Sequence, residues 1–445
     1  MAASNDTILG VLILARHGDR EGFYQDPTTY TATTTVITPL GTQQEFQLGQ
    51  ELRSIYLNAS SPSFISGVNG TLVNQTQVYV RADAGGELGV IYDSAVALLQ
   101  GLFPGNSNYT TDLANGTTVE GALGGYQYVP IESVEPNEDV SLEGYTDCNT
   151  FDDWTTEFYN SPAFLQKSNE SAAFLSQLPP YLDGRPVTLE NMIYDFMNVQ
   201  FIHNAAFAKA LPPTFLAQAL ALASYHEYGV FSSPQAFAGR TILPIMLSEL
   251  ESIANASNPL KLAYQSLAYK PFLSLFNMTG VAQQNPELAG IVNYAAAVAL
   301  EVRQPSSGGE PVIRFNFKNG TGQEFVTYNF LGTTGDVPLS ALVNHVNPAL
   351  INSTADWCTV CNNTQDRGCG ALALAASQAS AAAVKANVGH HQRISPVGAG
   401  FLGAGLTLAV FLAMFGVLAF VGVLTVGRGR SKARSTGSKD SEEKA

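Results

Sequence analysis

The sequence predicts an α/β fold in which a mixed, mostly parallel sheet is flanked by helices. Residues 7–15 (TILGVLILA) form a continuous apolar run rich in branched residues, which is typical of a strand buried on both faces. A helix with Pro39 in its first turn is expected over residues 38–57. A second strand is expected at residues 77–81 and a second helix at residues 93–102. This alternation of strand and helix indicates parallel strands joined by helices.

The pattern changes after residue 104, where turn residues and then helical stretches replace the alternation. We expect residues 105–235 to be a helical insertion into a core made of residues 1–104 and 236–350. The last two predicted strands of the core are expected to form a hairpin turned by Asn319 and Gly320. Strand patterns return in the second core segment, at residues 261–267, 295–303, 312–317 and 324–328.

A C-terminal apolar segment predicts a transmembrane helix within residues 397–427. Its residues 401–426 carry no charge and are long enough to cross a hydrocarbon layer of about 30 Å. The tail, residues 428–445, has six basic and three acidic residues, which places it in the cytosol. Residues 351–396 are expected to hold a cysteine-containing segment and an alanine-rich stalk. We therefore expect a single-pass membrane protein that contacts lipid through residues 401–426.

Twelve acceptor sites for N-linked glycosylation support an ectodomain outside the cell or in the lumen of the secretory pathway. None of them follows the apolar segment. Residues 8–15 are too few for a signal peptide and lack a basic start, so we expect a leader to be missing from this sequence. A tail anchor of opposite topology is the alternative. The acceptor residues are Asn5, Asn58, Asn69, Asn74, Asn108, Asn115, Asn169, Asn255, Asn277, Asn319, Asn352 and Asn362.

The four cysteines predict two disulfides. Three of them, Cys358, Cys361 and Cys369, lie close together before the stalk, and Cys148 lies far upstream. No histidine lies within this cluster, so a zinc site is the less favoured alternative and no metal is expected. The spacing does not fix which cysteines pair.

A cluster of basic residues stands out in an acidic protein. The 445 residues include 22 Lys and Arg against 37 Asp and Glu, a net charge of −15, which argues against a nucleic-acid partner. Yet Arg16 and Arg20 flank His17 at the end of the first predicted strand. Ligands of open parallel sheets bind beyond the carboxyl ends of strands, and guanidinium groups suit a tetrahedral anion. We expect an anion site with His17 as a potential nucleophile, and ordinary loop charges are the alternative.

These residues carry a family resemblance. The stretch LILARHGDR at residues 12–20 resembles the histidine acid phosphatase branch of the histidine phosphatase superfamily, which has the phosphoglycerate mutase-like fold. Residues 78–82 (VYVRA), followed by residues 93–104, are similar to that family's second arginine segment, and residues 294–303 resemble its late core strand.

The resemblance implies the hydrolysis of phosphate monoesters. It implies that His17 is the nucleophile that becomes phosphorylated and that Arg16, Arg20 and Arg81 bind the phosphate group. Neutral imidazole can attack phosphorus in line, while guanidinium groups stabilise charge on the equatorial oxygens. No cofactor is expected.

The sequence departs from the family at one motif. The family also uses a His-Asp pair at the start of a later helix, where the histidine binds phosphate and the aspartate protonates the leaving group. The matching residues are Ala268 and Tyr269, and losing a general acid typically costs about 10² to 10⁴ in rate. Tyr269 is the candidate substitute acid, with Lys270 beside it. The alternative function is a catalytically degenerate protein that binds an anionic or phosphorylated ligand, or a surface glycoprotein.

The remaining titratable residues are expected to be structural. We expect His203 to pack in the apolar interior of the insertion and His226 to cap the end of a helix. Glu249 is expected to be solvated.

Overall fold

The computed structural model describes most of the chain before residue 389. Residues 1–374 fall in one compact unit and residues 375–445 in a second. The central sheet, its flanking helices and the candidate site belong to the first unit. The described residues are 6–21, 35–85, 87, 89–185, 187–190, 193–232 and 235–388.

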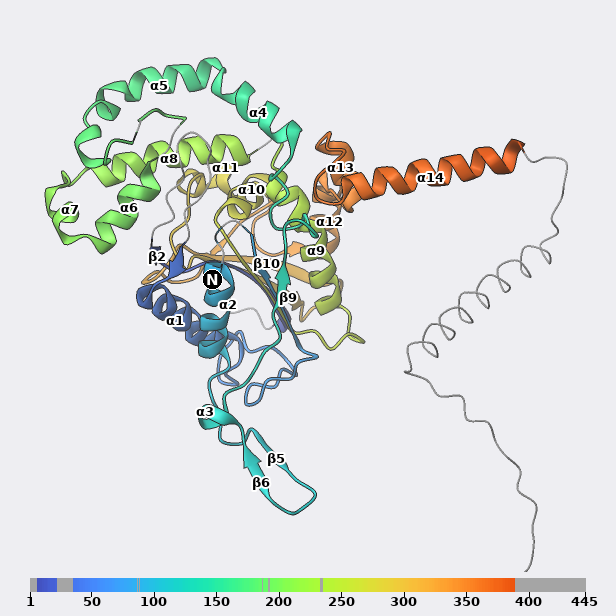
Figure 1. The fold of residues 1–445 in the computed structure, drawn as a ribbon. Helices are drawn as coiled ribbons and strands as arrows, with labels where there is room; N and C mark the ends of the chain where they lie inside the picture. Colours follow the sequence, from blue (N-terminus) through green and yellow to red (C-terminus); the bar gives the residue numbers. More distant parts are fainter. Residues whose placement is uncertain are drawn as a thin grey trace, which may run out of the picture. The chain divides into compact units, whose positions relative to one another are not determined.

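An eight-stranded mixed sheet forms the centre of the first unit (Figure 1). Strand β1 (Thr7–Arg16) lies in its middle, parallel to β8 (Leu262–Leu267) on one edge and antiparallel to β9 (Ala297–Gln304) on the other. The predicted α/β fold with a mixed sheet is confirmed. The strands β1, β8, β4 and β7 pair in parallel, and those from β9 onward pair antiparallel. The others are β4 (Val78–Asp83), β7 (Glu132–Val134), β10 (Val312–Lys318), β11 (Val326–Tyr328) and β12 (Val337–Pro338).

Helices cover both faces of the sheet. On one face lie α1 (Pro39–Tyr56) and α2 (Gly89–Leu102), which share an apolar core with β1 and β4. On the other lie α9 (Phe237–Ala254), α10 (Lys270–Met278) and α12 (Leu339–Val346), which pack against β9 and β10. The sheet is therefore desolvated on both faces, as a parallel sheet flanked by helices requires.

Alternate residues of β1 enter these two cores. Val11, Ile13 and Ala15 contact the α1 and α2 side, while Leu12 and Leu14 contact the α9 and α10 side. All five are at most 1 % exposed. The predicted strand is confirmed, and its apolar run has no polar alternation because neither face meets solvent.

The predicted helix over residues 38–57 is confirmed as α1. Thr38 is its N-cap and accepts a hydrogen bond from the Gly41 amide at 3.0 Å, while Pro39 occupies the first turn. The predicted hairpin pairing is also confirmed, because β10 and β11 pair antiparallel with Phe317 opposite Val326. The turn predicted at Asn319 and Gly320 was wrong in position: it lies at Thr321 and Gly322, where the Gln323 amide donates to the Gly320 carbonyl at 3.4 Å.

A group of helices between β7 and β8 surrounds an apolar cluster of its own, which includes Phe164, Leu178 and Met197. Figure 1 shows these helices as a green arc beside the sheet. Its α8 packs on α10, and its α6 approaches the loop after β1. The group comprises α4 (Asn149–Tyr159), α5 (Pro162–Leu175), α6 (Tyr194–His203), α7 (Ala205–Ala210) and α8 (Phe215–Phe231).

Several short elements and the long helix α14 complete the described chain. They are β2 (Arg20–Glu21), β3 (Val36–Ile37), β5 (Thr110–Asp112), β6 (Thr118–Glu120), α3 (Ala122–Gly125), α11 (Val281–Gln284), α13 (Thr354–Val360) and α14 (Cys369–Val388), with single 3-10 turns at Pro179–Tyr181, Pro286–Leu288 and Asn347–Ala349. The pairs β2 with β3 and β5 with β6 form two small separate sheets.

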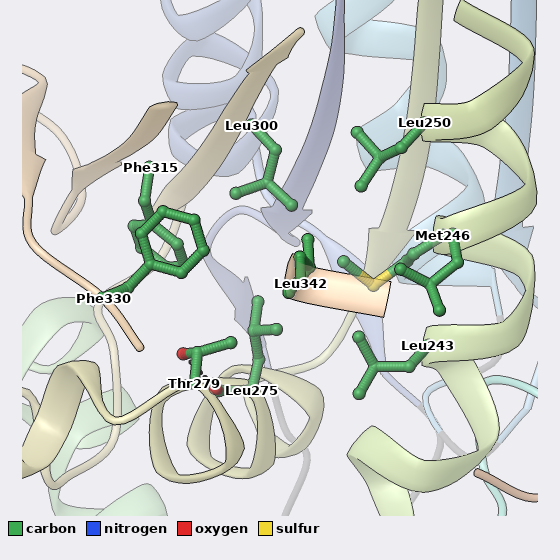
Figure 2. Close-up of a pocket in the computed structure, with 10 residues that line it drawn as sticks. Leu243, Met246, Leu250, Leu275, Thr279, Leu300, Phe315, Phe330 and Leu342 are labelled. Atoms are coloured by element: carbon green, nitrogen blue, oxygen red, sulfur yellow. Dashed lines mark hydrogen bonds between the residues drawn. The ribbon is translucent and has the colours of Figure 1, made fainter. Parts of the chain in front are cut away.

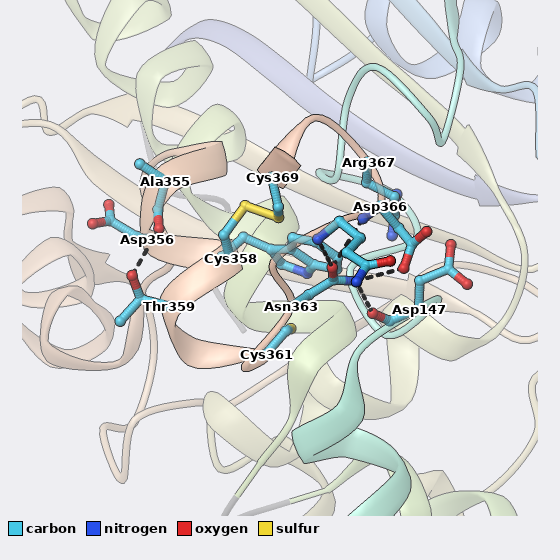
Figure 3. Close-up of a disulfide and its surroundings, with 12 residues drawn as sticks. Asp147, Ala355, Asp356, Cys358, Thr359, Cys361, Asn363, Asp366, Arg367 and Cys369 are labelled. Atoms are coloured by element: carbon cyan, nitrogen blue, oxygen red, sulfur yellow. Dashed lines mark hydrogen bonds between the residues drawn. A yellow bond between two sulfur atoms is a disulfide. The ribbon is translucent and has the colours of Figure 1, made fainter. Parts of the chain in front are cut away.

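The two predicted disulfides are confirmed, and the structure supplies their pairing. Cys148 pairs with Cys361, which ties the start of α4 to the end of α13 across 213 residues of chain. Cys358 pairs with Cys369, at the start of α14 (Figure 3). The Asn363 side chain next to them donates to the Asp147 carbonyl at 2.7 Å. These links join the helical group to the segment that follows the core.

A small apolar cavity lies between the sheet and the helices α9, α10 and α12 (Figure 2). Its volume is about 10 Å³, and it is lined by side chains such as Leu243, Met246 and Phe315. The hydroxyl of Thr279 beside it donates to the Leu275 carbonyl. A space of this size and polarity is a packing gap in the core and not a ligand site.

No helix in the described part of the chain is long and apolar enough to cross a membrane. The transmembrane helix predicted at residues 397–427 and the tail at residues 428–445 lie outside the described residues. The alanine-rich residues 371–386 of the predicted stalk lie within α14.

Candidate functional site

The carboxyl end of β1 is fixed by both of its neighbours. The Arg16 amide donates to the Ala296 carbonyl at 2.9 Å, and the His17 amide donates to the Leu267 carbonyl at 3.1 Å. The amide of Ala295 donates back to the His17 carbonyl at 3.3 Å. The backbone that carries His17 is therefore held between the ends of β8 and β9.

The next residues pack directly against the start of α1. A Cβ atom on Gly18 would lie 2.5 Å from the carbonyl oxygen of Gly41, so only glycine fits at this contact. The Asp19 amide donates to the Gln44 side chain at 2.9 Å, and the Asp19 carboxylate accepts from the Thr38 hydroxyl. The N-terminus of α1 thus orients the loop after β1.

The ring of His17 is fully buried and has a defined tautomer. Its Nδ1 lies 2.8 Å from the Gly18 carbonyl oxygen, which can only accept, so Nδ1 carries the proton. In the neutral ring this leaves the lone pair on Nε2. The Tyr294 ring lies 5.5 Å from the imidazole, centroid to centroid, and covers one side of it. His17 is therefore set up to use Nε2 as a nucleophile.

Glu87 closes the remaining side of the imidazole. Its Oε2 lies 3.0 Å from His17 Nε2 and 2.7 Å from Arg20 Nε. Burial raises the pKa of Glu87, but the charges of His17 and Arg20 lower it more, so the pKa is well below its ordinary value. The carboxyl group is therefore ionised at neutral pH. Glu87 therefore covers the Nε2 side of the ring, although His17 Nε2 makes no hydrogen bond of regular geometry within the described residues.

Arg20 is held between two carboxylates. Its Nη1 and Nη2 donate to the two oxygens of Asp195 at 3.2 and 3.1 Å, while its Nε faces Glu87. Asp195 lies in the first turn of α6 and so brings the helical group to the site. Burial lowers the pKa of Arg20, but Asp195 and Glu87 more than offset this and hold it well above its usual value.

Arg16 is stacked against aromatic rings. Its guanidinium carbon lies 4.5 Å from the centroid of the Tyr294 ring and 5.2 Å from that of Tyr269, at cation–π distance. Its Nη1 donates to the Val292 carbonyl, and its buried Nε has no hydrogen-bond partner within the described residues. Arg16 therefore keeps a donor free for a ligand, whereas both faces of Arg20 meet carboxylates.

Tyr269 lies at the site, but its hydroxyl is already engaged. It follows β8 and donates to Glu227 Oε2 at 2.8 Å, and Glu227 Oε1 lies 2.9 Å from His226. Burial raises the pKa of Tyr269 well above its usual value, and Glu227 raises it further. A phenol that holds its proton this tightly is a weak general acid. Lys270 stacks on the Tyr145 ring, with 4.4 Å from Nζ to the centroid.

The structure does not bring Arg81 to this group. Its Nη2 donates to Asp139 at 2.6 Å and to Ser141 at 3.0 Å, and its Nε lies 3.4 Å from Glu132. Arg81 lines a hollow of about 330 Å³ with residues of α9, whereas Val80, one position earlier, faces α1 and α2. The twofold alternation of side chains along β4 therefore directs Arg81 to the opposite face of the sheet.

Three expectations about other titratable residues were wrong. His203, the last residue of α6, does not pack inside the helical group. Its Nε2 lies 2.9 Å from Asp19 Oδ2. His226 lies inside α8 and not at a helix end, with its Nε2 2.8 Å from the Tyr159 hydroxyl. Glu249 is buried and accepts from Gln265, and burial raises its pKa to about 7.

Three residues of the site were missed in the sequence, namely Glu87, Asp195 and Tyr294. Glu87 could have been found, since it lies in a loop that follows a predicted strand at the same edge of the sheet as His17. Asp195 lies in a helix of the predicted insertion, and no local pattern relates it to Arg20. The described residues contain no group of three or more side chains that could hold a metal ion.

Comparison with known proteins agrees with this fold. The family model described as "Histidine phosphatase superfamily (branch 2)" matches residues 22–318. The chain belongs to this superfamily. The matched range begins after Arg20, so it assigns no role to Arg16, His17 or Arg20.

Similar proteins of this branch include two acid phosphatases. The chain is 24% identical to prostatic acid phosphatase of Bos taurus over 374 residues, which covers 80% of this chain and 88% of that protein. It is 24% identical to lysosomal acid phosphatase of Xenopus laevis over 371 residues, with 80% and 78% covered. Phytases have a similar fold. The Hafnia alvei phytase in complex with tartrate has a TM-score of 0.53 at 14% identity over 79% of this chain and 98% of its own.

A pH-dependent stability follows from Asp83, at the end of β4. Asp83 is 2 % exposed, and burial, together with the nearby charge of Glu143, raises its pKa to about 8. Between about pH 4 and 8 the unfolded chain loses this proton while the folded protein keeps it. The contribution of Asp83 to the free energy of unfolding should therefore be highest at acid pH and fall as the pH rises. Asp83→Asn should flatten this slope, with a gain on the order of a few kcal/mol at pH 8.

Urea unfolding between pH 4 and 8 measures this effect. The exposed Asp153→Asn on α4 is the matched control and should keep the wild-type slope. A slope that Asp83→Asn leaves unchanged would show that Asp83 is ionised in the folded protein.

Proposed function

We propose that this protein hydrolyses phosphate monoesters through a phosphohistidine at His17. The observation that supports this most is the hydrogen bond from His17 Nδ1 to the Gly18 carbonyl, which leaves Nε2 as the reactive nitrogen. Two buried guanidinium groups, those of Arg16 and Arg20, lie on either side of this histidine. Membership of the histidine phosphatase superfamily and the similarity to acid phosphatases support the same reaction class.

The proposed reaction has two steps. In the first, the Nε2 lone pair attacks phosphorus, the P–N bond forms, and the P–O ester bond breaks to release the alcohol. Arg16 and Arg20 stabilise the charge on the equatorial oxygens. In the second, water attacks the phosphohistidine, and phosphate leaves with the imidazole regenerated. Arg81 has no part in this scheme, because its guanidinium is paired with Asp139, Ser141 and Glu132.

The leaving alcohol needs a proton, and the site offers no ready donor. Ala268 has no ionisable group, and the Tyr269 hydroxyl is committed to Glu227. A phosphate monoester itself binds a proton with a pKa of about 6, so below that pH the substrate can supply the proton to its own leaving oxygen. We therefore propose a slow activity that is confined to acid pH and favours substrates with good leaving groups.

His17 is the first test of this proposal. His17→Asn should abolish the release of nitrophenol from p-nitrophenyl phosphate at pH 5, with a loss of at least about 10³-fold, since the proposed reaction uses the His17 imidazole as its attacking group. Incubation with labelled substrate should leave an acid-labile label on the wild type alone. His345→Asn, far from the site on α12, is the control and should keep the wild-type rate. Equal rates for wild type and His17→Asn would end the proposal.

A second candidate function is favoured by the same missing donor. Because Ala268 and Tyr269 stand where the family resemblance implies a His-Asp pair, the protein could be a degenerate phosphatase that only binds an anionic ligand. Its structure would then still provide the anion position beside His17. Both candidates bind an anion beside His17. They differ in whether the protein also hydrolyses it.

Restoring the pair separates the candidates. The Leu267 carbonyl bonds to the His17 amide, so Ala268 lies beside the nucleophile. Ala268→His combined with Tyr269→Asp should raise the rate on an alkyl phosphate by about 10² or more, since an alkoxide needs a proton to leave. The rate on p-nitrophenyl phosphate should rise much less, since nitrophenolate leaves unprotonated. Comparing kcat for both substrates at pH 5 measures this, and an equal rise on both would argue against a missing general acid.

We also infer that the protein acts as a glycosylated, membrane-anchored ectodomain of the secretory pathway. The twelve acceptor asparagines, the two disulfides and the similarity to a lysosomal acid phosphatase support this location. The division into a core, a helical insertion at residues 105–235, a stalk and an anchor at residues 397–427 belongs to the same proposal. Peptide N-glycosidase should lower the apparent mass of the protein isolated from its membranes. A mass that the enzyme leaves unchanged would contradict the location.

A further inference from the structure

Glu87 lies where an anion bound to His17 and Arg20 would have to lie. Its Oε2 is 3.0 Å from the nucleophilic Nε2 and 2.7 Å from Arg20 Nε. These are the two groups that a phosphate bound for attack by His17 would contact, one through phosphorus and one through an oxygen. The side chain of Glu87 is 9% exposed, so its carboxylate fills this position from within the protein.

The contact also blocks the chemistry of His17. While Oε2 lies 3.0 Å from Nε2, it occupies the space from which the Nε2 lone pair would meet phosphorus. Glu87 therefore competes with a ligand for Arg20 and removes the nucleophile at the same time. Asp195 competes with a ligand for Arg20 but does not face His17 Nε2, since its described ion pair is with Arg20. Its side chain is 34% exposed.

We propose that the Glu87 carboxylate is a built-in occupant of the phosphate position, and that an external anion binds there only when Glu87 takes up a proton and releases His17 and Arg20. The inference rests on the proposed function for the position of the phosphate group. A second anion cannot enter beside an ionised Glu87 in a buried site, because the two negative charges would repel at short range. Once neutral, the carboxyl group attracts Arg20 and His17 less strongly, and it can donate a hydrogen bond to the anion.

The surroundings of Glu87 decide which group takes up the proton. It is faced by His17 after β1, Arg20 in β2, Asp83 in β4, and Tyr145 and Tyr294 from the segments before α4 and β9. The pKa of Asp83 is raised by burial, so Asp83 already holds a proton near neutral pH. The pKa values of both tyrosines are raised as well, so they stay neutral. Glu87 is thus the buried carboxylate whose charge a ligand must replace.

The protein should therefore select its ligand by charge. An anion that enters together with one proton binds about tenfold more tightly for each unit by which the pH falls, over the range where Glu87 is ionised in the free protein. Singly protonated phosphate esters bring less negative charge next to Glu87, so they should be preferred over fully ionised esters and polyphosphates. The site is then matched to phosphomonoesters at acid pH.

Sulfate is the probe for this proposal, because its charge stays constant between pH 4 and 8. Its binding to the intact protein is measured by calorimetry in two buffers with different ionisation enthalpies, which counts the protons taken up. Wild type should take up about one proton per sulfate and bind more tightly as the pH falls. Glu87→Gln should take up almost none, lose most of the pH dependence and bind sulfate at least tenfold more tightly at pH 7.

Three further variants assign the proton. Asp195→Asn removes a charge from the other face of Arg20 and should tighten binding without changing the proton count. Glu157→Gln on α4 removes an exposed negative charge and should behave as wild type in both measurements. His17→Asn should keep proton uptake, because the proton goes to Glu87. Should Glu87→Gln not fold, Glu87→Asp withdraws the carboxylate and should weaken the pH dependence instead.

Several outcomes would overturn the proposal. Sulfate binding by wild type without proton uptake would overturn it on its own. An unchanged proton count in Glu87→Gln would do the same. Loss of uptake in His17→Asn alone would assign the proton to the histidine. Absence of sulfate binding in both wild type and Glu87→Gln would show that no anion position exists there. Proton-linked sulfate binding without hydrolysis rejects only the phosphohistidine mechanism, and hydrolysis with proton-independent sulfate binding rejects only the role of Glu87.

Discussion

The pairing of β1 with β8 on one edge and β9 on the other is the constraint on which the site depends. These ladders end where Arg16 and His17 begin, and the backbone of His17 still bonds to Leu267 of β8 and to Ala295, just before β9. His17, the proposed nucleophile, therefore lies at the rigid end of a strand, while the groups around it come from loops and from α6. Burial on both faces gives the strand its apolar sequence and also removes water from His17, which strengthens every charge interaction at the site.

Local features of the fold could be predicted from the sequence, because each rests on a few adjacent residues. The apolar run of β1, the Thr38 cap of α1 and the pairing of β10 with β11 are of this kind. The contacts of Arg20 are different, since Glu87 is 67 residues away and Asp195 is 175 residues away. No periodicity or spacing encodes such pairs. The sequence identified the cations of the site, and only the packed structure shows which carboxylates neutralise them.

Arg81 illustrates how a correct element can still carry a wrong expectation about a side chain. The strand β4 was predicted almost to its bounds, and it does end at the same edge of the sheet as β1. A strand offers its residues alternately to two faces, however, and a shift by one position reverses the face. Val80 and Ala82 enter the core with α1 and α2, so Arg81 points toward α9 and the acidic residues there.

The two carboxylates on Arg20 do not by themselves decide between an enzyme and a degenerate relative. Burying Arg20 without a counterion would be costly, so an empty site needs internal carboxylates whether or not it turns over substrate. What matters is how readily each counterion yields to a ligand. Asp195 can turn toward solvent at little cost because its side chain is 34% exposed. The side chain of Glu87 is only 9% exposed, so it cannot move away from Arg20 while it is ionised. A site built this way stays closed to anions at neutral pH and opens when Glu87 is protonated. The pairing of Arg20 with two carboxylates in the empty state is therefore compatible with catalysis in an acid compartment.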